Sequence, residues 1–80
     1  MNDLLKNITK LHTTALGAVR IKRNLALNAD DVLKWCTKKI CNKDSEIIQR
    51  GKNWYVYTDD CVITINAGSY TIITAHRRTK

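Results

Sequence analysis

Hydrophobic positions repeat with two different periods along this chain. Up to about Ile40 they recur every three or four residues, which is the spacing of one face of an α-helix. From Glu46 onward β-branched and aromatic residues dominate, and short turn sequences separate the runs. The pattern therefore predicts helices in the first half of the chain and strands in the second.

The second of the predicted helices has the clearest boundaries. A threonine before an apolar-periodic run is a typical N-cap, so this helix should begin near Thr13 or Thr14 and end near Leu25. Gly17 lowers its helix propensity by roughly 1 kcal/mol, which is better tolerated where another backbone passes close by. A shorter helix precedes it and ends near Lys10. The apolar positions of the second helix are Leu16, Ala18, Val19, Ile21 and Leu25.

Cap residues are predicted for the other two helices as well. Asn2 or Asp3 can cap the first helix. Asn28 can cap the third, and Asp31 three residues later resembles the second half of a capping box. The third helix should end within residues 42–44. Its buried stripe is expected to contain Val32, Leu33, Cys36 and Ile40.

The second half of the chain predicts an antiparallel sheet. The expected strands are Glu46–Arg50, Trp54–Tyr57, Cys61–Asn66 and Tyr70–Arg77. The connections between them are too short for crossovers, so the strands should form a meander. The predicted fold class is α+β, with two to three N-terminal helices packed on one face of a four-stranded antiparallel meander. We expect one domain over residues 1–80, helical in 1–42 and sheet in 45–78.

The loop around Gly68 decides which side chains of the last strand face the core. With an odd loop, Ile73 and Ala75 lie on the same face as Ile63 and Ile65. The opposite face then carries Thr64, Asn66, Tyr70, Ile72, Thr74 and His76. An even loop would bury Tyr70, Ile72 and His76. The odd loop is favoured because it keeps a titratable side chain out of the core.

The charge of the chain indicates a polyanionic partner. Its 80 residues carry fourteen lysines and arginines against seven acids, a formal net charge of +7. Nucleic acid, RNA in particular, or a nucleotide is the partner that such a field favours. The N-terminal sequence has neither the apolar core of a signal peptide nor the length of a membrane span, so we expect a cytoplasmic protein with no membrane contact.

The cysteines and histidines do not have metal-site spacing. Cys36, Cys41 and Cys61 are odd in number and lack a second pair, and His12 and His76 stand apart from them. We expect reduced thiols, no metal and no cofactor.

The end of the last strand is the first candidate for chemistry. His76 could exchange a proton near a bound phosphate, because imidazole titrates near neutral pH. Arg77 and Arg78 beside it could stabilise negative charge on a phosphodiester. The alternative is a basic C-terminal segment without a specific role. His76 and Arg77 are therefore candidate catalytic residues, and Arg78 is a candidate phosphate ligand.

Two further groups could contact nucleic acid. His12, Arg20 and Arg23 could grip phosphates from the first two helices, although a solvated helix face explains them as well. Tyr55 and Tyr57 share one face of a strand and could stack on bases next to Lys52, whereas Trp54 faces the core. Asp59 and Asp60 are interpreted as turn residues.

Two stretches of the chain carry a resemblance to a known family. The runs LHTTALGAVRIKRNL and GKNWYVYTDDCVITINAGSYTIITAH together resemble a family of small uncharacterised bacterial and phage proteins of about this length. In layout alone, the chain is similar to the barnase–EndoU–colicin–RelE superfamily of RNA-cleaving toxins. That resemblance implies catalytic roles for His76 and Arg77 at the last strand, and for His12 and Arg20 on the early helices.

The leading functional hypothesis is a small RNA-directed protein that resembles RelE-like toxins. That resemblance implies endoribonuclease activity. The alternative is a non-catalytic counter-defence protein of a phage, which captures a nucleotide or covers a defence complex. An antitoxin or a defence complex would then be the protein partner. A third option is an interaction module that dimerises through an edge strand such as Glu46–Arg50. The sequence leaves the oligomeric state open.

Overall fold

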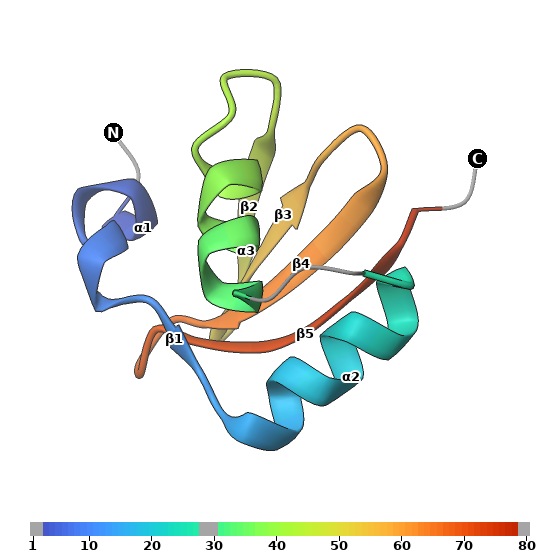
Figure 1. Cartoon of the computed structure of the whole chain (residues 1–80). Coiled ribbons are helices and arrows are strands. Elements are labelled where there is room, and N and C mark those ends of the chain that lie inside the picture. Colours follow the sequence, from blue (N-terminus) through green and yellow to red (C-terminus); the bar gives the residue numbers. More distant parts are fainter. Residues whose placement is uncertain (1–2, 28–30, 79–80) are drawn as a thin grey trace.

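The computed structural model describes residues 3–27 and 31–78, which form helices followed by strands (Figure 1). The helical elements are α1 (Asp3–Lys6), the 3-10 helix η1 (Ile8–Lys10), α2 (Ala15–Leu25) and α3 (Val32–Ile40). The strands are β1 (His12–Thr13), β2 (Glu46–Arg50), β3 (Asn53–Tyr57), β4 (Cys61–Asn66) and β5 (Thr71–Arg77). The predicted α+β class is confirmed.

Over the described residues the sheet has five strands rather than the predicted four, in the order β1-β5-β4-β3-β2. Strands β2 to β5 form the expected antiparallel meander. The additional strand β1 pairs parallel with β5, and the backbone N–H of His12 donates to the carbonyl of Tyr70 at 3.1 Å. The prediction of a purely antiparallel sheet is therefore wrong, because two residues are too few to show an alternating pattern and were interpreted as a helix cap.

Helix α2 begins where its cap predicts. The Oγ1 of Thr14 accepts a hydrogen bond from the backbone N–H of Gly17 at 3.0 Å. A Cβ at Gly17 would lie 2.9 Å from the Oγ1 of Thr13 and 3.5 Å from the carbonyl oxygen of Ile72, so β5 does pass close to this glycine. Leu16 and Val19, interpreted as apolar positions, are exposed at 71% and 51%.

Helix α3 begins three residues later than a cap at Asn28 would place it. Its N-cap is Asp31, whose side chain accepts a hydrogen bond from the backbone N–H of Lys34 at 3.0 Å. Asn28, like Asn2, lies outside the described residues. The buried stripe contains Val32, Cys36 and Ile40 as expected, while Leu33 is half-buried.

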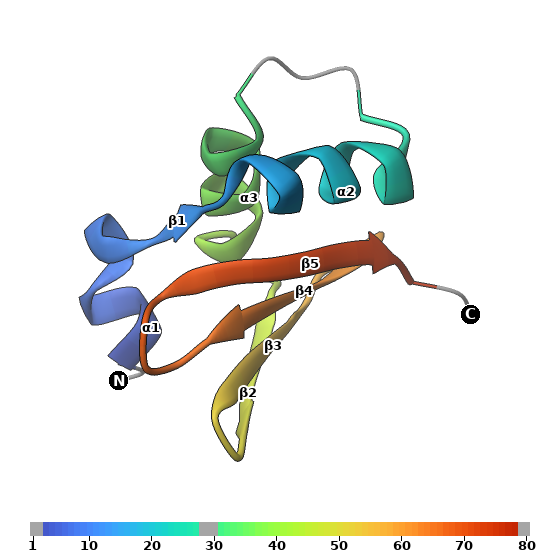
Figure 2. The ribbon, with the colours of Figure 1, turned by 90° about the horizontal axis from the view of Figure 1, so that it is seen from below.

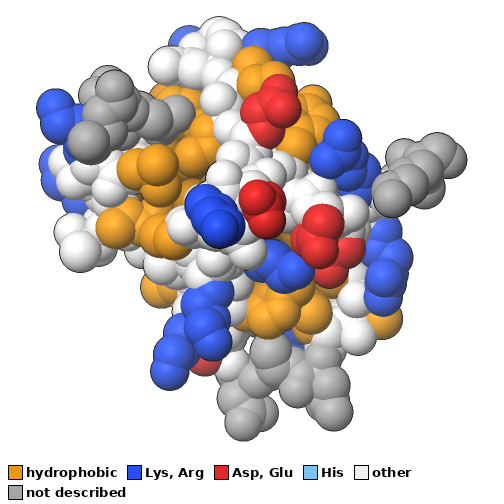
Figure 3. Space-filling model, turned by 90° about the horizontal axis from the view of Figure 1, so that it is seen from above, with side chains coloured by type: hydrophobic (Ala, Val, Ile, Leu, Met, Phe, Trp, Pro, Cys, Tyr) orange, Lys and Arg blue, Asp and Glu red, His pale blue; other side chains and the backbone are white. Residues whose placement is uncertain are grey.

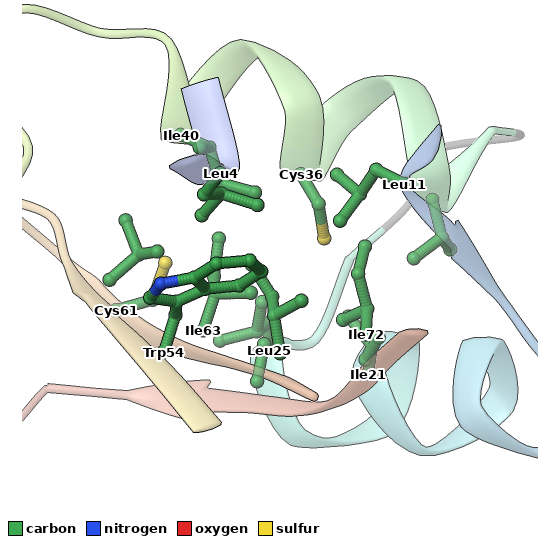
Figure 4. Packing of buried hydrophobic residues seen from close by; sticks show 14 residues of the cluster. Leu4, Leu11, Ile21, Leu25, Cys36, Ile40, Trp54, Cys61, Ile63 and Ile72 are labelled. Atoms are coloured by element: carbon green, nitrogen blue, oxygen red, sulfur yellow. The ribbon is translucent and has the colours of Figure 1, made fainter. Parts of the chain in front are cut away.

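The core lies between the helices and one face of the sheet (Figure 4). Leu4 of α1, Ile21 of α2 and Ile40 of α3 are fully buried against Ile63 and Ile72 of the strands. Burial of each such side chain contributes roughly 1.5–3 kcal/mol to folding. Each of the three α-helices thus supplies at least one anchor to the sheet.

A β-bulge between β4 and β5 combines the two registers that the loop around Gly68 allowed. Ile63 pairs with Ala75, as in the odd register, but Ile65 pairs with Ile72, as in the even one. Ile72 is therefore 1% exposed and Ile73 is 40% exposed, so both were assigned to the wrong face. Tyr70, also expected on the open face, packs against the core instead, whereas His76 is exposed as predicted.

Helices α2 and α3 lie on the same side of the sheet (Figure 2). Within residues 3–27 and 31–78, no helix covers the opposite face, which we call the open face. Trp54, Val56 and Ile63 point toward the helices. Side chains alternate along a strand, so neighbours such as Tyr55 and Tyr57 point away from the helices. By this alternation the open face carries Glu46, Ile48, Arg50, Asn53, Tyr55, Tyr57, Val62, Thr64, Asn66, Thr71, Thr74 and His76.

Candidate nucleic-acid interface

Two tyrosines lie next to each other on the open face of β3. Tyr55 stands opposite Thr64 of β4, and Tyr57 stands opposite Val62. Both rings are half-buried, and the two β4 side chains between them and β5 are only 9% exposed. The open face is thus a closely filled surface, with two partly exposed aromatic rings on the strand next to the β2 edge.

A cationic group lies against one of these rings. The guanidinium carbon of Arg78 is 5.5 Å from the ring centroid of Tyr57, which is the distance of a cation–π contact. Arg78 also donates from its guanidinium to the carbonyl of Thr58 at 2.9 Å. His76 belongs to the same end of the open face, because it stands opposite Val62, the partner of Tyr57. Tyr57, His76 and Arg78 therefore belong to the same end of the open face.

Arg77, predicted to act with His76 and Arg78, points to the other side of the sheet. Its guanidinium donates to the carbonyl of Leu25, the last residue of α2, at 3.0 Å. The cause is the alternation of side chains along β5, which separates neighbours in sequence. The last carbonyls of a helix have no intrahelical partners and favour a cation, so this contact stabilises the end of α2.

His12 lies at the opposite end of β5 from His76. It pairs with Thr71, five residues before His76, which corresponds to roughly 15 Å along a strand. Its Nδ1 is 3.0 Å from the carbonyl of Lys10, and its Nε2 is 2.9 Å from the Oγ1 of Thr71. The structure therefore does not bring the two histidines to a common phosphate.

The other predicted phosphate ligands are also apart from the tyrosines. Arg20 and Arg23 are exposed on α2, which packs on the helical side of the sheet. Lys52 is exposed in the turn between β2 and β3. Of the nine site residues predicted from sequence, the structure places Tyr55, Tyr57, His76 and Arg78 on the open face, and His12 lies at the other end of that face beside Thr71.

Basic side chains do not form an uninterrupted patch on the face seen from above. Figure 3 shows acidic side chains near the middle of that face, with lysines and arginines around them. Asp59 and Asp60 both bind the Nζ of Lys39, at 3.5 and 3.1 Å. These ion pairs offset part of the positive charge at the end of α3, and no sequence signal predicted them.

The thiols are not poised for nucleophilic chemistry in the core. Cys36, Cys41 and Cys61 are all unpaired. Burial, together with the neighbouring Cys61, raises the pKa of Cys36 to about 12, and burial also raises the pKa of Cys61. Protonated thiols are poor nucleophiles. In the described residues, no three His, Cys, Asp or Glu side chains lie together as a metal site would require.

The sequence also matches a family model over residues 5–76, most of its length. The family is described as "Protein of unknown function (DUF3781)". This chain belongs to that family. The match confirms the predicted resemblance to a small uncharacterised family, and it does not extend to the RNA-cleaving toxins. Searches of curated proteins and of solved structures gave no significant match. No helix in the described part of this family member is long and apolar enough to cross a membrane.

Proposed function

We propose that this protein binds single-stranded RNA on the open face of its sheet and does not cleave it. The observation that supports this most directly is the position of Tyr55 and Tyr57, side by side on a sheet face that the described helices leave uncovered. Arg78 against the Tyr57 ring adds a cation at the same place.

Stacking is the interaction that such a surface offers. Bases of single strands stack on aromatic rings and on planar guanidinium groups, with little dependence on sequence. Arg78 is held by Thr58 and Tyr57, so it presents both a plane and a charge without further ordering. The net charge of +7 supplies the long-range attraction that brings a phosphate backbone to the molecule.

Cleavage receives less support from the geometry than binding does. Transfer of the proton from a 2′-hydroxyl and to the leaving oxygen needs a base and an acid within hydrogen-bond reach of one phosphodiester. The two predicted histidines do not meet, because His12 is roughly 15 Å from His76 along β5. Arg77 already donates to Leu25, on the other side of the sheet.

The test measures fluorescence anisotropy of a short, labelled single-stranded RNA. We expect Tyr55→Ala and Tyr57→Ala each to weaken binding by roughly tenfold to a hundredfold, the value of one lost stacking contact. Tyr55→Phe and Tyr57→Phe are the matched controls, because they keep the ring and remove only the hydroxyl. They should bind within about twofold of the parent protein, since stacking needs the ring alone.

Two results would contradict this proposal. If the alanine variants bind RNA as well as the parent protein, the open face is not the binding surface. If the parent protein cuts the RNA and His76→Ala does not, the protein is an endoribonuclease of the kind that the layout resemblance implies. Intact RNA on a denaturing gel after long incubation is the expected result.

One observation favours a second candidate, the non-catalytic counter-defence protein with a protein partner. Leu16 and Val19 are exposed on α2, and Arg20 and Arg23 share that outer surface at helical spacing. An apolar pair flanked by arginines suits an acidic protein surface. Under this alternative, the double variant Leu16→Ser/Val19→Ser should lose the counter-defence effect of the protein. Its folding and its binding to RNA should not change.

A further inference from the structure

The two edges of the sheet are protected to different degrees against pairing with a further strand. At the β5 edge, β1 pairs with Thr71 and Ile72, and the side chain of Asn24 donates to the carbonyl of Ala75 at 3.3 Å. A bulge also bends this edge. At the other edge, β2 pairs with β3 over its whole length without a register shift, and no described strand follows it. In Figure 2, β2 lies at the far end of the sheet from β5.

Strand β2 contains neither proline nor lysine, and its pairing with β3 has no bulge, so it lacks three of the usual devices that prevent edge pairing. Such devices are proline, lysine within the strand, a bulge, or a covering element. The sequence EIIQR contains no proline or lysine, and charged side chains stand only at its two ends, Glu46 and Arg50. A five-residue edge of this kind, paired without interruption on its other side, is competent to pair with a further strand.

The geometry of the neighbouring turn shows which backbone groups are free to pair. Arg50 and Asn53 are opposite each other across the two-residue turn Gly51-Lys52, and Gly51 has φ +57°, as the first position of a type II′ turn requires. The residues that close such a turn exchange hydrogen bonds with each other. Because bonding alternates along an antiparallel strand, Ile47 and Gln49 direct their N–H and C=O groups away from β3.

On the open face, β2 carries an acidic side chain at one end and a basic side chain at the other. Glu46, Ile48 and Arg50 share that face, because they stand opposite Tyr57, Tyr55 and Asn53. The acid and the base are equally far from the central isoleucine. A two-fold axis through Ile48 would therefore place Glu46 of each copy opposite Arg50 of the other, and Ile48 opposite Ile48.

We propose that the protein forms a homodimer by antiparallel pairing of β2 with β2 of a second copy, centred on Ile48. In this register Ile47 and Gln49 of the two copies exchange backbone hydrogen bonds, and both ends carry an opposite-charge pair. Shifting the register by two residues would place Ile48 opposite Glu46 or opposite Arg50 of the second copy, and both Glu46–Arg50 pairs would be lost.

The dimer would join the two sheets into one continuous sheet. The open faces of both copies would then lie on the same side, since a two-fold axis perpendicular to the sheet preserves the face. This inference does not depend on RNA binding, because Glu46 and Arg50 are not among the residues proposed to contact RNA. The contact is one strand pair, so we expect weak, concentration-dependent association at the low end of interface sizes.

Sedimentation velocity of the full chain over a concentration series is the primary test. We expect the mass to rise from 9.2 kDa toward twice that value. Glu46→Arg places two arginines opposite each other at both ends, and Arg50→Glu does the same with two glutamates. Each variant should weaken association by about tenfold or more, because like charges directly opposite are destabilising.

The two charge variants also provide their own control. In an equimolar mixture of Glu46→Arg protein and Arg50→Glu protein, opposite charges face each other again at both ends, so the heterodimer should form as well as the parent dimer. The double variant Glu46→Arg/Arg50→Glu should dimerise alone for the same reason. Rescue in the mixture excludes misfolding as the cause of the loss in either single variant.

A cysteine at the centre tests the register. Ile48 would be a non-hydrogen-bonded pair with its own copy, with Cα atoms about 4.5 Å apart, a separation that a disulfide accepts. In a Cys41→Ser background, which removes the exposed thiol, Ile48→Cys should give a covalent dimer on oxidation and Gln49→Cys should not. A monomer at every concentration, charge variants that dimerise unchanged, or a covalent dimer through Gln49 in place of Ile48 would overturn the proposal.

Discussion

At the scale of single residues, Asp60 connects two elements that are distant in sequence. Its carboxylate accepts from the Nζ of Lys39, at the end of α3, and from the Oγ1 of Thr58 at 3.1 Å, in the turn before β4. Partial burial alone would raise the pKa of Asp60, but the hydrogen bonds from Lys39 and Thr58 lower it below the ordinary value. The charged form of Asp60 is therefore favoured in the folded state.

We predict that Asp60→Asn lowers the free energy of unfolding at neutral pH by about 0.5–1 kcal/mol, the range of a partly exposed ion pair. A carboxyl whose folded pKa is lowered stabilises the protein above its unfolded pKa, about 3.9, and this contribution is lost as the pH falls through the lower folded pKa. The difference between parent and variant should thus be largest near pH 7 and shrink below about pH 3.9. Urea unfolding at several pH values measures it.

Asp59→Asn is the control for this prediction. Asp59 contacts the same lysine at 3.5 Å, but its side chain is 83% exposed, so solvent screens the interaction. Asp59→Asn should lower the free energy of unfolding by less than half as much as Asp60→Asn does. Equal effects of the two variants, or a difference at Asp60 that grows as the pH falls, would show that the ion pair does not stabilise the fold in this way.

The sequence could not reveal this contact. Asp59 and Asp60 were interpreted correctly as turn residues, because paired aspartates between two strand patterns favour a turn. Lys39 precedes Asp60 by 21 residues, and which lysine of α3 reaches the turn depends on how the helix is rotated above the sheet. The separation of Arg77 from Arg78, in contrast, follows from strand alternation, and could have been predicted once β5 was assigned.

At the scale of elements, the boundaries of β2 and β4 agree with the sequence prediction, while β1 and the register of β5 do not. Turn residues on both sides define β2 and β4, and these signals are local. Strand β1 is too short to have a pattern, and it exists because Tyr70 and Thr71 offer a partner from the far end of the chain. The bulge is likewise invisible locally, because Ile72 and Ile73 are equally apolar.

The bulge predicts opposite consequences for two adjacent isoleucines. Ile72 is 1% exposed in the core, so Ile72→Ala should lower the free energy of unfolding by about 2–4 kcal/mol, through lost burial and the cavity left behind. Ile73 is 40% exposed, so Ile73→Ala should cost less than about 1 kcal/mol. Chemical denaturation of both variants measures the difference directly.

This pair of variants separates the observed register from the uniform odd register. In the odd register Ile73 faces the core with Ala75, and the larger loss of stability would belong to Ile73→Ala. Because the two substitutions are chemically identical and adjacent, differences in helix or strand propensity cancel between them. A larger effect at Ile73, or equal effects, would mean that β5 is not bulged at this point.

At the scale of the whole molecule, part of the positive charge lies on the side opposite the aromatic surface. The aromatic rings of Tyr55 and Tyr57 are on the open face, whereas Arg20 and Arg23 belong to α2 on the helical side. Composition correctly gives the excess of cations but cannot place them, because their placement depends on which face of each helix and strand is buried. The two sets of side chains should therefore affect different steps of binding to RNA.

Long-range charge acts mainly on the rate of association, and direct contacts act on the rate of dissociation. The double variant Arg20→Gln/Arg23→Gln lowers the formal charge of +7 by two without touching the open face. We expect it to slow association with RNA by about twofold to threefold at roughly 0.01 M ionic strength, with much less effect at 0.15 M, where the Debye length is about 8 Å. Its dissociation rate should equal that of the parent protein.

Tyr57→Ala is the complementary variant, because it leaves every formal charge in place. It should speed dissociation by about tenfold or more and leave association nearly unchanged, since a stacked base is lost only after the encounter. Stopped-flow measurement with a labelled single-stranded RNA at both salt concentrations resolves the two rates. If the arginine variant instead dissociates faster and the tyrosine variant does not, RNA binds on the helical side, and the open face has another occupant.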